Sequence, residues 1–390
     1  MLRRPSRLIV FTGTATALSL LGDQALYALL PVYFQEMGLL PVQVGILLSA
    51  NRWIRLFTNH LAERIVDKHP AHLMFAASLL LGALLTAVYA ISSSFLVLLI
   101  ARCLWGLCWS FIRHISVMGV ASGSDHQNLG QMMGFYNGIS RIGGVAGIMI
   151  GGILFDLVGF TNTLISFCFL SILAVPIALS SGVQSLGTQG KKWIAEQPVS
   201  ANRALMLCGF CVGSVGPGLI MSTLGFILLS RYGQEVNLLG FIIGIATLNG
   251  LLLGCRWILD TLGAPVYGAL IDRSGIHIGA PLCFFVGAVV MMLLTFGTSL
   301  MSLASGIIVF FMCGTALATA VSAEAGRLGS KVYATYATSG DLGAAFGPLI
   351  GWTAFEFLDA PDLTFILGAI LYTIGFFGAI AAFQRPPNLE

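Results

Sequence analysis

Twelve apolar stretches, each long enough to cross a lipid bilayer, constrain the fold of this chain more than any other feature. A membrane-spanning helix needs about 20 mostly apolar residues. The stretches cover residues 8–34, 41–66, 70–92, 95–121, 128–156, 160–181, 203–230, 238–270, 279–297, 300–323, 332–357 and 362–384. Only 9% of the 390 residues are charged, which is too few to cover a water-exposed surface. The stretches lack the strict alternation of β-barrel strands, so the sequence predicts an all-α integral membrane protein.

The longest polar segment between these stretches divides them into two sets of six. It lies within residues 182–202 and is rich in Gly, Ser and Gln, as flexible linkers are. We therefore expect a six-helix bundle at 1–181 and a second one at 203–390. Within the second bundle, Pro265 is expected to kink or end the membrane part of its long stretch.

Basic residues are unevenly distributed among the connecting segments. If both termini are cytoplasmic, the cytoplasmic segments hold twelve Lys or Arg residues, and the loops on the other side hold Arg231 alone. Cytoplasmic loops carry such an excess of positive charge. We expect a multi-pass protein of the plasma (inner) membrane with both termini cytoplasmic. The net charge of +3 then reflects topology and not nucleic-acid binding.

Two internal repeats relate the halves. A glycine row recurs 200 residues later, ending in Asp156 in the first half and Glu356 in the second. The paired glycines are Gly143, Gly147 and Gly151 with Gly343, Gly347 and Gly351. Glycines four residues apart give one smooth helix face that allows close packing in lipid. The tripeptide RWI also occurs twice, at 52–54 and 256–258, each time upstream of an acidic–basic pair. Parallel repeats of this kind are typical of transporters whose site lies where the repeats meet.

The acidic–basic pairs lie in loops that resemble a known signature. GALIDRSG, at 268–275, is similar to the Gly–Asp–Arg–x–Gly loop of the major facilitator superfamily. The equivalent ERIVDKHP keeps Asp67 and Lys68, although Glu63 replaces the glycine. LLIARCLWG is similar to that family's Leu–x3–Arg–x3–Gly pattern, and GFYNGISRIGGVAGIMIGG resembles its antiporter motif without the proline.

The chain thus resembles the major facilitator superfamily over its whole length, and most of all its bacterial drug and siderophore exporters. The resemblance implies two six-helix bundles related by a pseudo-twofold axis. It also implies gating roles for the two loop pairs, Asp67 with Lys68 and Asp272 with Arg273.

Charged residues in the middle of apolar helices are costly, so they are expected to face a water-filled cavity or one another. The nine such residues are Asp23, Arg52, Arg55, Arg102, Arg113, Arg141, Arg256, Asp260 and Asp341. Six arginines and three aspartates leave a net charge of +3, which favours an anionic substrate.

Arg55 and Asp260 occupy equivalent positions in the two halves, and so do Arg141 and Asp341. In the fold that the resemblance implies, cross-half pairs Arg55–Asp341 and Arg141–Asp260 would clamp the halves together. The alternative is pairing within each half, for example between Arg256 and Asp260, which are four residues apart on one helix.

Asp23 is the first candidate for a proton carrier, followed by Asp341 and Asp260, because burial and a nearby arginine shift a carboxyl pKa in opposite directions. The alternative role of Arg102 is that of a structural anchor for Asp23. The candidate cavity residues are Tyr27, Asn51, Arg52, Arg55, Arg102, Trp109, Arg113, Asn137, Arg141, Arg256 and Tyr336. For the uncharged ones, helix–helix hydrogen bonding is the competing interpretation.

These observations favour a secondary transporter that exports a small organic molecule in exchange for protons, with an uptake permease for an organic anion as the alternative. No GxxxxGK[ST] or HExxH motif is present, which argues against an ATP-driven pump and a zinc enzyme. We expect no cofactor and no metal, and a monomer in the bilayer.

Overall fold

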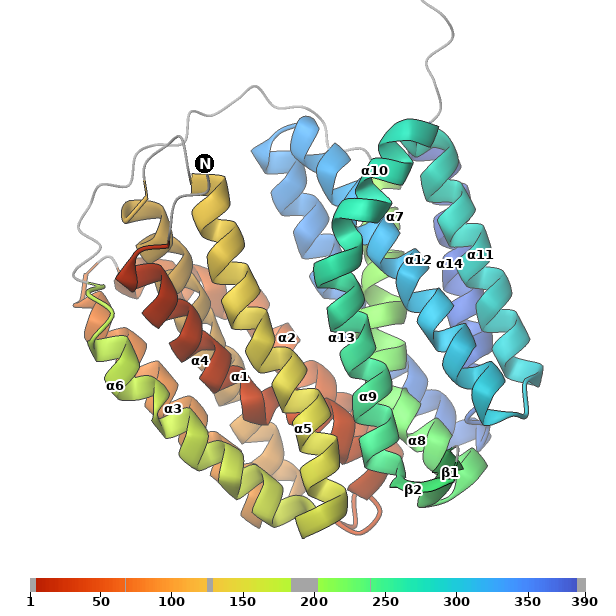
Figure 1. Cartoon of the computed structure of the whole chain (residues 1–390), viewed down its shortest axis with the longest axis horizontal. Helices are drawn as coiled ribbons and strands as arrows, with labels where there is room; N and C mark the ends of the chain where they lie inside the picture. Colours follow the sequence, from red (N-terminus) through yellow and green to blue (C-terminus); the bar gives the residue numbers. More distant parts are fainter. Residues whose placement is uncertain (1–4, 67, 125–128, 184–202, 239, 384–390) are drawn as a thin grey trace, which may run out of the picture. The chain divides into compact units, whose positions relative to one another are not determined.

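Helices make up almost all of the structure, a computed structural model that describes residues 5–66, 68–124, 129–183, 203–238 and 240–383. In the first half they are α1 (Arg7–Tyr33), α2 (Pro41–Val66), α3 (Ala71–Ile91), α4 (Phe95–Ser122), α5 (Leu129–Ile172) and α6 (Ala174–Leu179) (Figure 1). The elements that follow are α7 (Arg203–Gly213), η1 (Ser214–Ile220), α8 (Met221–Tyr232), β1 (Glu235–Leu238), β2 (Phe241–Gly244), α9 (Ile245–Ile258), η2 (Leu259–Gly263), α10 (Ala264–Ser274), α11 (Ile276–Phe296), α12 (Leu300–Arg327), α13 (Ser330–Leu358) and α14 (Leu363–Phe383).

A helix lies in each of the twelve apolar stretches. Within the described residues, eight helices are long and apolar enough to cross a membrane. One of them, 131–179, covers most of two of the stretches, 128–156 and 160–181, and Gly159 (φ +82°) interrupts its helical backbone between them. The helices α2, α9–α10 and α13 are not among the eight, and these three carry Arg55, Asp260 and Asp341. Mid-helix charges also occur in three of the eight apolar helices, with Asp23 on α1, Arg102 on α4 and Arg141 on α5.

The stretch predicted at 238–270 differs from the structure at its start. Residues 235–238 and 241–244 form an antiparallel pair of strands, β1 and β2, and helix α9 begins only at Ile245. The turn is stabilised because the Asn237 side chain accepts a hydrogen bond from the Gly240 N–H (2.9 Å), and Gly240 has a φ of +90°. After the π-helical segment η2, the helix continues past Pro265 as α10 to Ser274, and the end of its membrane part at Pro265 stays a prediction.

The chain forms two compact units. Unit 1 consists of Met1–Leu39, Ala50–Trp193 and Ala246–Leu251, and unit 2 of Leu40–Ser49, Ile194–Ile245 and Leu252–Glu390. Each unit therefore combines most of one half of the chain with a short segment of the other half, taken from the first turns of α9 or α2. Most of the predicted linker lies outside the described residues.

Equivalent helices pack closely inside each unit. In unit 1, α5 lies beside α1 (Figure 1), and a Cβ on Gly143 would collide with the Ala17 carbonyl oxygen. In unit 2, a Cβ on Gly343 of α13 would likewise collide with the Phe210 carbonyl oxygen of α7. The two glycine rows thus serve the same close contact in both units, as their spacing predicts.

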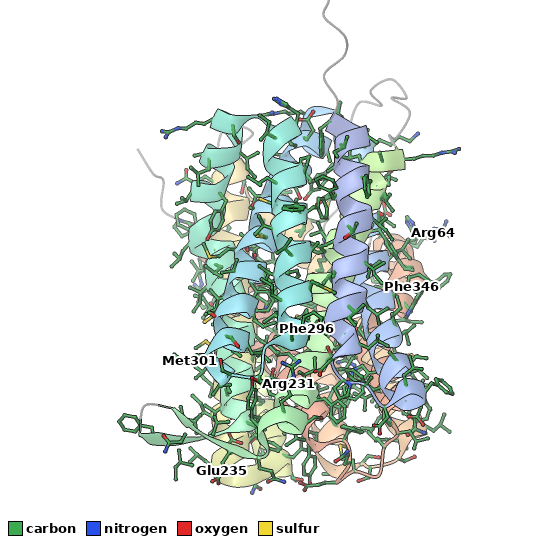
Figure 2. The ribbon with its side chains drawn as sticks, turned by 90° about the vertical axis from the view of Figure 1, so that its right-hand side faces the viewer. Arg64, Arg231, Glu235, Phe296, Met301 and Phe346 are labelled. Atoms are coloured by element: carbon green, nitrogen blue, oxygen red, sulfur yellow. The ribbon has the colours of Figure 1, made fainter. Side chains whose placement is uncertain are left out.

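Arg231, the single basic residue of the predicted external loops, ties together three helix ends in unit 2. It forms an ion pair with Asp362 at 2.6 Å, at the start of α14. Its other nitrogens donate to the carbonyl oxygens of Gly297 (2.8 Å) and Leu294 (3.1 Å), at the end of α11. Figure 2 shows Arg231 at the same end of unit 2 as strand β1, which begins at Glu235. Arg231 therefore stabilises the packing of these helix ends.

Candidate transport site

Asp23 of α1 forms a buried ion pair with Arg102 of α4 in unit 1. Both side chains are 2% exposed, and the Arg102 Nη1 donates to Asp23 Oδ1. The same carboxylate accepts hydrogen bonds from the Asn51 Nδ2 (3.4 Å) and the Gln24 Nε2 (3.0 Å). A buried carboxylate remains charged only with such partners. The interpretation of Arg102 as an anchor for Asp23 is therefore realised in the structure.

Close approach of two helices brings Asn51 to this pair. A Cβ on Gly106 of α4 would lie 2.7 Å from the Asn51 carbonyl oxygen of α2, so only glycine permits this distance between the backbones. Gly106 belongs to the LLIARCLWG motif, one turn after Arg102. The motif thus supplies both the arginine and the space that a polar neighbour on α2 needs.

Two arginines lie against the ring of Tyr27, one turn after Asp23 on α1. The guanidinium carbon of Arg102 is 5.8 Å from the ring centroid, and that of Arg52 is 5.7 Å away. Arg102 also lies 5.9 Å from the ring of Tyr89. Aromatic faces attract cations, so these rings help to hold positive charge inside unit 1. Among the predicted cavity residues, the structure thus brings together Tyr27, Asn51, Arg52 and Arg102.

The other predicted residues of α4 lie further along the helix. Trp109 stacks on Trp105 with ring centroids 5.7 Å apart, and Arg113 is exposed, in contrast to buried Arg102. The two arginines on this face of α4 therefore differ in environment, since Arg102 is buried and Arg113 is exposed.

Asp260 has a looser environment in unit 2. Its Oδ1 accepts a hydrogen bond from the Thr315 hydroxyl at 2.5 Å, and its Oδ2 lies 3.8 Å from the Arg256 Nη2. The Arg256 guanidinium also contacts the Met221 sulfur (3.3 Å) and the Trp257 ring (5.6 Å). The within-half alternative for Asp260 is thus present in the structure. Cross-half pairs Arg55–Asp341 and Arg141–Asp260 would join residues of different units and stay predictions.

The remaining predicted residues are distributed over both units. Asn137 and Arg141 are exposed on α5, whereas Arg55 and Asp341 are half-buried. Tyr336 is buried, and its ring packs at Gly209 of α7, which suits a packing role.

The structure describes only some of the residues in the two predicted loop pairs. Lys68 and Arg273 are exposed, Asp67 lies outside the described residues, and Asp272 is described only as part of the α10 backbone. Their gating role stays a prediction.

Gln24 and Thr315 are not among the predicted site residues, although they donate hydrogen bonds to Asp23 and Asp260. Gln24 adjoins Asp23, so a second polar residue in an apolar helix was an available signal. Thr315 offered none, because threonines in membrane helices are common and its partner is 55 residues away.

The paired charges inside apolar helices and the repeated packing of α1–α5 and α7–α13 agree with the family comparison. The model of the Major Facilitator Superfamily matches residues 12–348. The chain belongs to this superfamily. It has the two-bundle, all-α membrane fold of that family.

Individual relatives are distant. The chromaffin granule amine transporter of Rattus norvegicus is 24% identical over 134 residues, which are 34% of this chain and 26% of that protein. The match therefore spans about a quarter of that relative's length. A bacterial homologue of the human lysosomal transporter Spinster has a TM-score of 0.78 at 12% identity, covering 99% of this chain and 100% of that one. The nucleoside transporter NupG has a TM-score of 0.77 at 14% identity, covering 97% and 100%. Such likeness establishes the fold alone.

Proposed function

We propose that this transporter exports small organic anions in exchange for protons, with Asp23 as the proton carrier and both termini in the cytoplasm of a cell bounded by its plasma (inner) membrane. The observation that carries the proposal is the sealed Asp23–Arg102 pair. A proton that reaches Asp23 neutralises the carboxylate and releases Arg102, which could then take an anionic partner in its place. An anionic substrate and the Asp23 carboxylate would therefore compete for the same arginine, and protonation of Asp23 would decide between them.

The neighbours of Asp23 suit proton delivery. The Asn51 Oδ1 and the Gln24 Oε1 are buried, and neither accepts a hydrogen bond from any residue that the structure describes. Buried amide oxygens favour a hydrogen-bond donor. Because both side chains already donate to Asp23, their oxygens lie beside the carboxylate, where a water molecule could pass a proton to it.

The anionic preference rests on charge. The mid-helix set has six arginines against three aspartates, and two of the aspartates are paired in the structure. This excess of arginine over aspartate attracts carboxylates more than organic cations.

Purified protein in vesicles that contain a pH-sensitive dye tests the coupling. Adding members of a panel of organic carboxylates to the parent should cause proton flux, and Asp23→Asn should abolish that flux while anion-for-anion exchange persists. Asp359→Asn is the matched control, because Asp359 is an exposed residue of the α13–α14 turn. Undiminished proton flux in Asp23→Asn would contradict the assignment.

Direction is tested in cells. A deletion strain should accumulate the transported anion in the cell interior if the protein is an exporter. Failure of that strain to take up an anion from the medium would instead support the uptake permease.

A further inference from the structure

Three side-chain amides lie along one stretch of α1 in unit 1, and each has a buried oxygen that lacks a donor. The oxygens are Gln24 Oε1, Asn51 Oδ1 and Asn249 Oδ1, and none accepts a hydrogen bond from any residue that the structure describes. The whole Asn249 side chain is buried, and Asn51 is only 4% exposed. Buried polar atoms nearly always have a partner, so these three acceptors indicate a donor from outside the chain.

The orientation of each amide is fixed by its nitrogen. The Gln24 Nε2 and the Asn51 Nδ2 donate to the Asp23 carboxylate at 3.0 and 3.4 Å. The Asn249 Nδ2 donates to the Ala28 carbonyl oxygen at 3.0 Å. Ionised carboxylates and carbonyl groups accept hydrogen bonds and do not donate them. Turning any of these amides over would therefore set oxygen against oxygen, so exchange of the two atoms does not satisfy it.

The amides belong to α1, α2 and α9 and lie close together along α1. Their partners Asp23 and Ala28 are five residues apart on that helix, which is about 7.5 Å. Gly250, the neighbour of Asn249, allows α9 to approach α5, because a Cβ there would lie 2.7 Å from the Ile148 carbonyl oxygen. Packing inside unit 1 thus holds the three amides in place.

Two arginines border the same stretch of α1. Arg102 forms the ion pair with Asp23, and the half-buried Arg52 directly follows Asn51 in α2. Their guanidinium carbons lie 5.8 and 5.7 Å from the ring centroid of Tyr27. An anion bound here is therefore near two positive charges and near three hydrogen-bond acceptors.

This combination favours an anion that carries its own hydrogen-bond donors. A substrate hydroxyl group that displaces water can donate to an amide oxygen in its place. A methylene group there leaves the oxygen buried and unpaired, which lowers affinity on the order of 10-fold for each oxygen. An ammonium group also donates, but the two arginines repel its charge.

We propose that the transported anion is a small hydroxycarboxylate, with its carboxylate at Arg102 and its hydroxyl groups at the amide oxygens of Gln24, Asn51 and Asn249. The inference rests on the proposed function, because the anion has to reach Arg102. It narrows the substrate class from organic anions in general to those that carry hydroxyl groups close to the carboxylate.

Transport of matched carboxylates by the full chain in vesicles tests the proposal. Propionate, lactate and glycerate have the same carbon skeleton and carry no, one and two hydroxyl groups, and alanine has an ammonium group where lactate has its hydroxyl. The parent should transport lactate about 10-fold more efficiently than propionate, and glycerate more efficiently still. Alanine should be transported no better than propionate.

Two variants assign this preference to the amides. Asn249→Leu and Gln24→Met should each lower the glycerate-to-propionate ratio about 3- to 10-fold, because each removes one acceptor. The matched control is Ser171→Ala. Ser171 is also buried and donates to an α1 carbonyl oxygen, that of Leu18, at 2.8 Å, but it supplies no amide oxygen. Its ratio should equal that of the parent, because a loss of packing alone slows all substrates alike.

Equal transport of propionate and glycerate by the parent would overturn the proposal, and this result needs no variant to fold. A ratio that both amide variants leave unchanged overturns it too, as does faster transport of alanine than of lactate. If the ratio is as expected and proton flux is absent, the proton coupling is wrong and the hydroxycarboxylate assignment stands. If no carboxylate is transported at all, the anionic substrate of the export proposal is wrong and this inference fails with it.

Discussion

The mid-helix pairs Asp23–Arg102 of unit 1 and Asp260–Arg256 of unit 2 differ in almost every physical respect. Asp23 and Arg102 are 79 residues apart, 2% exposed, and in direct contact. Asp260 and Arg256 are four residues apart on one helical run, 21% and 16% exposed, with 3.8 Å between the nearest atoms. The first pair is a tertiary contact that depends on the packing of two helices, whereas the second is a local pair that the helix itself supplies. We therefore expect the same two residue types to contribute much more to the stability of unit 1 than to that of unit 2.

Removing Arg102 should have the largest effect. Arg102→Ala leaves the Asp23 carboxylate buried without its main partner, which typically costs about 3–5 kcal/mol. We expect a strong fall in thermal stability in detergent and poor recovery of folded protein. The double variant Asp23→Asn/Arg102→Met should recover much of that loss, because neither charge is then buried alone. A melting temperature equal to that of the parent for Arg102→Ala would show that water already reaches the pair.

Thr315→Val should have an intermediate effect in unit 2. The substitution keeps the shape of the side chain and removes the hydroxyl that donates to Asp260 at 2.5 Å. Hydrogen bonds to charged groups contribute about 1.5–3 kcal/mol, and we expect the lower end because Asp260 is partly exposed. Thr319→Val, one turn further along α12, serves as the matched control because that hydroxyl donates to the Thr315 carbonyl oxygen. Equal losses in both variants would assign the effect to the helix and not to Asp260.

Asp260→Asn should cost less than about 1 kcal/mol, the range of partly exposed pairs. Asparagine keeps an oxygen for Thr315 and removes only the attraction to Arg256. Equilibrium unfolding in detergent, compared with Asp23→Asn, measures the contrast between the two pairs. A loss as large as that of Asp23→Asn would mean that exposure does not weaken the unit 2 pair.

A change in ionic strength should have the smallest effect, and it should act on the Asp260–Arg256 pair alone. Raising ionic strength from 0.15 to 1 M shortens the screening length from about 8 to 3 Å. The stability difference between parent and Asp260→Asn should shrink, whereas that between parent and Arg102→Ala should stay constant. A salt-independent Asp260→Asn difference would place this pair away from water.

Much of the fold could be predicted from the sequence because its causes are local or periodic. Long apolar stretches predict the helices, and glycines four residues apart predict close packing, which Gly143 and Gly343 show in equivalent places. The strand pair β1–β2 was not predicted, because its few apolar residues continue the hydrophobicity of α9 and only the Asn237–Gly240 turn distinguishes it.

The candidate site was predictable in its residues and less so in its contacts. A charge inside an apolar stretch, such as Asp23 or Arg102, is conspicuous because burying it is costly. The partners Gln24 and Thr315 are ordinary polar residues of membrane helices, so nothing in their sequence neighbourhood marks them.

By itself, the sequence determined a membrane-embedded, two-halved chain with nine charges in its apolar helices, since apolarity, repeat offset and glycine spacing follow from residue order. Only the tertiary structure decided that Asp23 takes Arg102, and that the Asn249 amide takes the Ala28 carbonyl oxygen. The reason is physical: several aspartates and arginines could neutralise one another equally well, and the choice depends on which helices pack closely enough to exclude water between them.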